Sequence, residues 1–181
     1  MNERPAQYHT RGKGTKAEFL MAEYAAMRPY GLTLLRLSVG AIFVAHGAQK
    51  LFGAWGGPGL TGTTAMVASL GLPYPYPLAI LLTLSEFCGG IFLLLGWLTP
   101  WASGALLAAM AVAIWKVHYP NGFFMNWANT PGQGHGIEYN VALVGALLCL
   151  LLAGPGALSI DDWRSRTHEA RERGRARIRK V

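Results

Sequence analysis

The chain has 181 residues, of which 52% are hydrophobic and only 14% are charged. This balance is too apolar for an ordinary soluble protein and indicates a membrane protein with room for one domain. The formal net charge of +7 comes mainly from Lys and Arg in the last 18 residues, and a basic tail beside a membrane favours anionic lipid over nucleic acid as its partner.

The first 28 residues are expected to lie outside the membrane core. Residues 1–16 are polar and basic and predict a tail without fixed structure. Residues 17–27 (AEFLMAEYAAM) predict a short helix on the membrane surface, and Pro29 suits the first turn of a new helix. No cleavable signal peptide is expected, because the first apolar run is too long and too charged.

The first membrane span is predicted over residues 30–52 and carries three ionisable side chains. On a helix, Arg36, His46 and Lys50 fall within an arc of about 80°. Ionisable groups inside a membrane helix usually face protein or water and mark a functional site. In the alternative reading, Arg36 and Lys50 only extend towards opposite membrane surfaces, which leaves His46 unexplained. Two glycines near the same arc would admit a neighbouring helix backbone: Gly40 and Gly47.

Residues 53–76 contain no Lys, Arg, Asp or Glu and predict a loop with a short helix packed across the mouth of the bundle. Thr61 or Thr63 would cap this helix, which would end near Gly71. Three further spans are predicted, over residues 78–98, 101–118 and 137–154, with a tight turn at 99–101. Their ionisable residues include Glu86, Lys116, His118 and Glu138.

Four spans place both chain ends on one side of the membrane. Lys and Arg crowd the two tails, whereas residues 53–76 and 119–136 have none, so the positive-inside rule predicts both ends in the cytoplasm. The predicted fold is therefore an all-α integral membrane protein, a four-helix bundle over residues 29–156. Residues 157–181 form its basic cytoplasmic tail.

Depths estimated at 1.5 Å per residue place His46 about 10 Å, Glu86 about 13–15 Å and Arg36 about 25 Å below the outer face. Unpaired charges at such depths are costly, so we expect Glu86 to pair with Arg36 or His46, and Glu138 with Lys50 or Lys116. Such pairs alone would serve only to fix helix register. The additional histidines predict a polar, outward-opening pocket whose binding residues are Arg36, His46, Lys50, Glu86, His118 and Glu138.

The pocket predicted in this way suits a quinone head group, a small anion or a proton relay through His and Glu. A metal site from His118, His135 and Glu138 is disfavoured because the ligand spacing is wrong and two cations crowd it. A haem between His46 and His118 is disfavoured for lack of an open apolar slot. No Ser–His–Asp set, P-loop or dinucleotide motif occurs, and no catalytic residue is assigned. Cys88 and Cys149 lie in apolar runs and are expected to be buried rather than bonded.

Several segments of the sequence together resemble one family. These are LLRLSVGAIFVAHGAQKLFG, SLGLPYP, EFCGGIFLLLGWLTPWA, VHYPNGFF, GIEYNVAL and GPGALSID, in this order over residues 30–161. They are similar to the DoxX family of small four-helix bacterial membrane proteins. The family pattern falls on Arg36, Gly40, His46, Gly47, Lys50, Glu86, Gly90, Gly96, His118, Gly122, Glu138 and Tyr139. Pro100 departs from it, because the family often has a basic residue there.

The resemblance implies a bacterial inner-membrane subunit near quinone or sulfur redox chemistry, because the family name comes from a quinone-linked oxidase subunit and its relative DoxD belongs to thiosulfate:quinone oxidoreductase. We therefore expect a redox-associated subunit that binds a quinone or small redox substrate. A second hypothesis is a scaffold that holds a soluble redox partner at the cytoplasmic face through its basic tail. A transporter is a third, disfavoured without inverted repeats or a broken helix. Small-residue faces on the second and third spans permit an oligomer.

Overall fold

The structure is a computed structural model that describes residues 15–178, and the predicted N-terminal tail lies almost wholly outside them. The described residues form helices and no strands. The longer helices are α1 (Lys16–Phe52), α2 (Gly59–Ser69), α3 (Pro75–Leu95), α4 (Thr99–Ala113), α5 (Glu138–Ala153) and α6 (Ile160–Ile178). One-turn helices η1 (Ala54–Gly56), η2 (Ile114–His118) and η3 (Tyr119–Asn121) complete the set.

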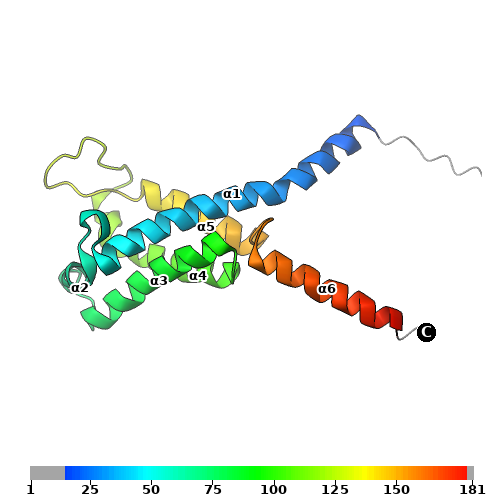
Figure 1. The fold of residues 1–181 in the computed structure, drawn as a ribbon. Helices are drawn as coiled ribbons and strands as arrows, with labels where there is room; N and C mark the ends of the chain where they lie inside the picture. The colour runs from blue at the N-terminus through cyan, green and yellow to red at the C-terminus, as the bar shows by residue number, and fades with distance from the viewer. Residues whose placement is uncertain (1–14, 179–181) are drawn as a thin grey trace, which may run out of the picture.

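Helices α1, α3, α4 and α5 lie side by side in a bundle (Figure 1). The helices Lys16–Phe52, Pro75–Leu95 and Thr99–Asn121 are each long and apolar enough to cross a membrane, and α5 is an apolar helix of 16 residues. The start of α1 and the whole of α6 project from the same end of the bundle, which we call the tail end (Figure 1). Helix α2 and the segment 119–137 lie at the opposite end, the loop end.

Helix α1 is one continuous helix of 37 residues, so the predicted separate surface helix before Pro29 is wrong. It begins at a capping box in which the Glu18 amide donates to Thr15 Oγ1 at 3.3 Å and the Thr15 amide donates to Glu18 Oε2 at 2.7 Å. Pro29 lies inside the helix. A single proline removes one backbone hydrogen bond, and the Ala, Leu, Met and Glu residues before it favour helix strongly enough to continue through it.

The glycines predicted to admit a neighbouring helix do so between α1 and α3. A Cβ atom at Gly47 would lie 2.5 Å from the backbone nitrogen of Phe87, and one at Gly40 would lie 3.0 Å from the carbonyl oxygen of Gly90. Gly90 repeats the arrangement from α3, because its Cβ would lie 2.7 Å from the Val44 nitrogen. The two backbones are therefore close enough that only glycine fits at these positions.

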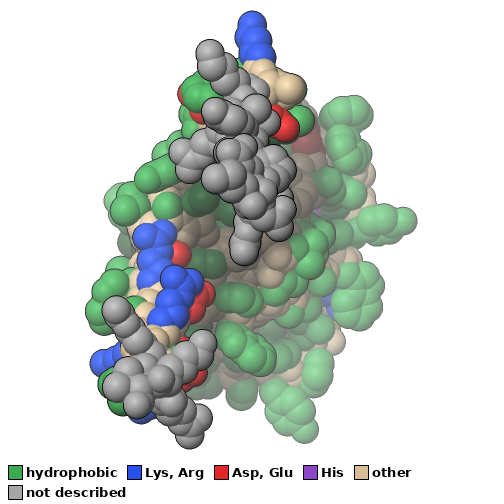
Figure 2. Space-filling view, turned by 90° about the vertical axis from the view of Figure 1, so that its right-hand side faces the viewer, with side chains coloured by type: hydrophobic (Ala, Val, Ile, Leu, Met, Phe, Trp, Pro, Cys, Tyr) green, Lys and Arg blue, Asp and Glu red, His purple; other side chains and the backbone are tan. Residues whose placement is uncertain are grey.

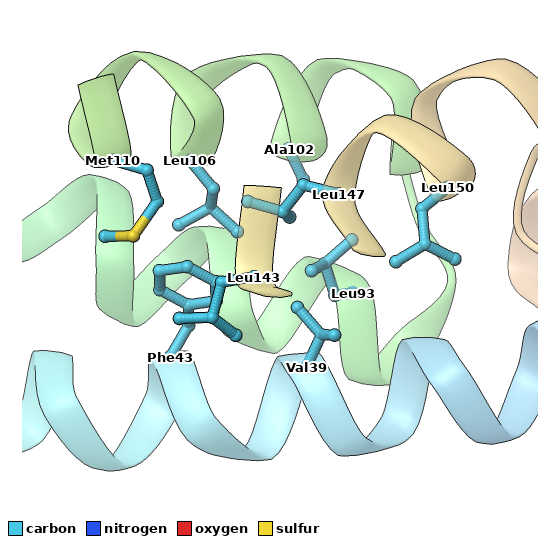
Figure 3. Packing of buried hydrophobic residues seen from close by; sticks show 9 residues of the cluster. All are labelled: Val39, Phe43, Leu93, Ala102, Leu106, Met110, Leu143, Leu147 and Leu150. Atoms are coloured by element: carbon cyan, nitrogen blue, oxygen red, sulfur yellow. The ribbon is translucent and has the colours of Figure 1, made fainter. Parts of the chain in front are cut away.

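The apolar core lies between the four bundle helices (Figure 3). Its members are fully or almost fully buried: Val39, Phe43, Leu93, Ala102, Leu106, Met110, Leu143, Leu147 and Leu150. Leu93, Leu106, Leu147 and Leu150 each have 0% exposed surface. Packing of this kind fills the middle of the bundle with apolar side chains.

Several local predictions are wrong. The turn after α3 falls at residues 96–98 rather than 99–101, because the Asp161 carboxylate accepts from the amides of Leu98 (3.0 Å) and Thr99 (2.9 Å) and caps α4 there. Neither Thr61 nor Thr63 caps α2, whose N-cap is Pro58. Cys149 is exposed on the bundle surface, whereas Cys88 is half-buried, and both are free thiols.

The basic tail contains the 19-residue helix α6. The segment immediately before α6 packs against α1. Figure 2 looks onto the tail end, where Lys, Arg, Asp and Glu side chains gather on α6 and on the start of α1, and hydrophobic side chains cover the flanks. The exposed arginines of α6 include Arg164, Arg166, Arg171, Arg173 and Arg175. This division of charge and apolar surface is the one expected of a bundle whose flanks face lipid.

Candidate functional site

A cavity of about 420 Å³ opens at the loop end, next to the apolar core. Phe43, Met110 and Leu143 belong to both the core and the cavity wall. All four bundle helices and the loop after η3 contribute to the lining, which consists of Ile42, Phe43, His46, Lys50, Glu86, Met110, Ala113, His118, Met125, Trp127, His135, Tyr139, Asn140 and Leu143. Its size lies within the range of small-molecule sites, and its wall is mainly apolar with a few polar groups.

The main charged feature of the cavity is an ion pair between α1 and α3. Lys50 Nζ lies 2.6 Å from Glu86 Oε1 and 2.7 Å from Oε2. The Glu86 side chain is 2% exposed and that of Lys50 is 27% exposed, so the carboxylate is buried beneath the ammonium group. An ammonium has three hydrogens, and two suffice for these bonds, which leaves the third to a ligand.

The predicted partner of Glu86 was Arg36 or His46, and the structure pairs it with Lys50 instead. The prediction was wrong because it compared only the depths of the backbone positions. Such a comparison ignores how far a lysine side chain reaches along the surface of a helix. The Arg36 part of the prediction fails for a second reason. Arg36 is 1% exposed at the tail end, where its Nη2 donates to the Leu158 carbonyl at 3.1 Å, and it does not line the cavity.

Two histidines of the cavity differ in how they are held. His46 lies one helical turn before Lys50 and remains exposed to the cavity, and among the described residues no hydrogen-bond partner of its ring is found. His118 ends the π-helical turn η2, and its Nδ1 lies 2.9 Å from the carbonyl oxygen of His135. π-Helical turns often occur at functional sites, where they redirect side chains.

Glu138 does not line the cavity and forms no ion pair with Lys50 or Lys116, contrary to the prediction. Its carboxylate accepts from the Met125 amide at 3.0 Å, and its own amide donates to the Phe123 carbonyl at 2.8 Å. The Lys116 ammonium lies over the Trp115 ring, 4.1 Å from its centroid. Glu138 therefore positions the loop that carries Met125 and Trp127 into the cavity wall.

Glu138→Ala is expected to loosen this loop while the bundle stays folded. The charge-assisted bond to the Met125 amide is worth about 1.5–3 kcal/mol, so its loss should raise local opening at least tenfold. Hydrogen–deuterium exchange of a peptide from residues 122–137 measures the change. Glu138→Gln is the matched control, because its amide oxygen still accepts from Met125. Equal exchange in the wild type and both variants would contradict the assignment.

Sequence reasoning did not assign Met125, Trp127 or Asn140 to the cavity, and it gave Tyr139 only as a position of the family pattern. Asn140 is 5% exposed on α5, and its Nδ2 donates to Met110 Sδ at 3.6 Å. The side-chain amide of Asn140 lies two residues inside an apolar span, and this position in the sequence could have indicated that it belongs to a polar site. Met125 and Trp127 gave no such signal, because their place depends on how the loop folds back. Within residues 15–178, no cluster of His, Cys, Asp or Glu large enough to hold a metal ion is found.

Comparison with known proteins identifies a family and a relative of this chain. The sequence profile of the DoxX family matches residues 31–119. The inner membrane protein YphA of Escherichia coli (strain K12) is 33% identical over 145 residues, which cover 77% of this chain and 94% of that protein. No solved structure matches the chain. The chain therefore belongs to the DoxX family and is a multi-pass protein of the bacterial inner membrane.

Proposed function

We propose that the chain crosses the membrane four times, through α1, α3, α4 and α5, with both ends in the cytoplasm. The two ends of the described chain project from one end of the bundle, as an even number of crossings requires (Figure 1). The 16 residues of α5 span about 24 Å, which approaches the hydrocarbon thickness. The loop end lacks Lys and Arg in residues 53–76, and the tail end is rich in both. The cavity then opens towards the periplasm.

Single cysteines test this topology. In a Cys88→Ala/Cys149→Ala background, we expect a cysteine at Asn129 to react with a membrane-impermeant maleimide in intact spheroplasts. A cysteine at Ser165 should react only after the membrane is permeabilised. Both positions are exposed, so access to the reagent depends on the side of the membrane alone. Labelling of Ser165→Cys in intact spheroplasts would overturn the orientation.

We further propose that the cavity binds the head group of a quinone or a similarly small redox substrate. The observation that carries this proposal is the buried Glu86 carboxylate, which holds the Lys50 ammonium at the wall of a mainly apolar cavity. Lys50 and His46 would donate to a ring oxygen, and Trp127 and Tyr139 offer aromatic surface to a ring. Because Glu86 neutralises Lys50, the cavity suits an uncharged polar ligand better than an anion.

Titration of the purified protein in lipid nanodiscs with decylubiquinone tests the proposal by calorimetry. We expect saturable binding that weakens about five- to tenfold in His46→Ala, the loss of one hydrogen bond. His46 is preferred to Lys50 for this test because its removal leaves no buried charge unpaired. His168→Ala on α6 is the matched control, since that histidine is exposed far along the tail helix. Binding that is absent, or unchanged in His46→Ala, would refute this site.

A second candidate function is a scaffold for a soluble redox partner, favoured by the exposed arginines of α6. A projecting helix with such charge offers a docking surface for an acidic protein. Truncation after Asp162 removes most of α6 and keeps the Asp161 carboxylate that caps α4. If a partner that co-purifies with the full chain is still retained by the truncated one, the scaffold function is excluded.

A further inference from the structure

We infer that His118 is a specificity-determining residue that makes the cavity bind the reduced, dihydroxy form of a ring more tightly than the oxidised, dicarbonyl form. The inference deepens the proposed function and rests on it, because it concerns the redox state of the ring that the same cavity holds. It begins from the hydrogen bond between His118 and the loop after η3.

The partner of His118 Nδ1 is the main-chain carbonyl oxygen of His135, at 2.9 Å. A carbonyl oxygen only accepts hydrogen bonds, so Nδ1 must carry a hydrogen and donate it. In a neutral imidazole one nitrogen donates and the other accepts. In the neutral ring the Nε2 atom of His118 is therefore the acceptor, and this ring lines the cavity.

The carbonyl that fixes this tautomer is held by a folded loop. Asn121 Nδ2 donates to the Val117 carbonyl at 2.9 Å and also reaches the His135 oxygen at 3.4 Å. The amides of Gly136 and Ile137 donate to the carbonyls of Phe124 and Gly122 at 3.1 Å each, which closes the loop immediately after His135. The acceptor character of His118 is thus set by the fold, whereas a free histidine would choose either tautomer.

Among the other polar side chains of the wall, Lys50 offers a donor, whereas the Tyr139 hydroxyl and the Asn140 oxygen also offer acceptors. Both Glu86 oxygens face the Lys50 ammonium, which retains a hydrogen for a ligand. His46 adopts either tautomer and serves either form of a ring. A carbonyl oxygen of a quinone would place a lone pair against the lone pair of His118, whereas a quinol hydroxyl would donate to it. A ligand complementary to Lys50 and His118 together therefore combines an acceptor for Lys50 with a donor for His118.

The test compares decylubiquinol with decylubiquinone under anaerobic conditions, by calorimetry of the protein in nanodiscs. We expect the wild type to bind the quinol about tenfold more tightly, as one satisfied hydrogen bond in place of a repulsion implies. The dimethyl ether of the quinol, which has no hydroxyl hydrogen, should lose this advantage on the unaltered protein. His118→Phe should bind both forms equally, and His118→Gln, which keeps an acceptor and a donor, should retain part of the preference.

The outcomes separate the inference from the function on which it rests. A preference for the quinol that disappears with the dimethyl ether and in His118→Phe supports the inference. Equal binding of both forms by the wild type overturns it and leaves the proposed quinone site intact. A preference that persists at full strength in a folded His118→Phe also overturns it. Binding of neither form overturns the proposed function and the inference together. His168→Phe is the matched histidine control on α6.

Discussion

Lys50→Met is expected to destabilise the protein more than any other change in the cavity. It leaves the Glu86 carboxylate, 2% exposed, without the ammonium that lies 2.6 Å away. Removing one partner of a buried ion pair typically costs about 3–5 kcal/mol, since an uncompensated charge remains inside the protein. Thermal unfolding of the purified protein, followed by circular dichroism in one detergent, measures the loss.

The double variant Lys50→Met/Glu86→Gln is the matched control for this prediction. It removes the stranded charge along with its partner, so we expect it to recover most of the stability lost in Lys50→Met. Glu86→Gln alone should cost less than Lys50→Met, because the ammonium is 27% exposed and reaches water. If Lys50→Met unfolds at the wild-type temperature, the ion pair does not stabilise the bundle.

Gly47→Ala is the second change with a large expected effect, and it acts through the backbone. The added Cβ would lie 2.5 Å from the nitrogen and 2.6 Å from the Cα of Phe87, atoms that move only if α1 and α3 separate. Overpacking of this kind costs about 1–3 kcal/mol and sometimes more. Because Phe87 adjoins Glu86, we also expect the ion pair to be disturbed and binding at the cavity to weaken.

Gly31→Ala is the control for Gly47→Ala, since it lies on the same helix and its Cβ would meet no atom within 4 Å. Alanine is a better helix former than glycine by about 0.5–1 kcal/mol, so Gly31→Ala should be neutral or slightly stabilising. Thermal unfolding of the two variants side by side isolates the helix contact from helix propensity. Equal melting temperatures would show that α1 and α3 are less close than described.

The bundle was predictable from the sequence because long apolar helices leave few alternatives in lipid. The clustering of His46, Lys50, Glu86 and His118 at one cavity was also predictable, since all four are costly to expose to hydrocarbon. Which of them pair was not, because that depends on side-chain reach rather than on backbone depth. The prediction of a new helix at Pro29 was wrong, because the preference of proline for the start of a helix is weaker than the helix propensity of the residues before it.

Two residues were wrongly predicted to line the cavity, and the reason is a different one. Arg36 and Glu138 bind backbone groups of segments that are distant or irregular, Leu158 and Met125. Hydrogen bonds to the backbone of a loop leave no pattern in residue type or spacing, so charge alone could not separate them from ligand-binding groups. Glu138 fixes a loop of the cavity wall, whereas Arg36 joins α1 to the segment before α6 at the tail end.

The Asp161 carboxylate joins the start of α6 to the first turn of α4. It accepts from the Leu98 and Thr99 amides, while its own amide donates to the Gly96 carbonyl at 2.9 Å. A displacement of α6 would therefore strip the first turn of α4 of its acceptor. Proteins fused beyond Ile178 should leave the membrane helices intact, whereas a chain cut before Asp161 should unwind the opening turn of α4 and admit water between α3 and α4.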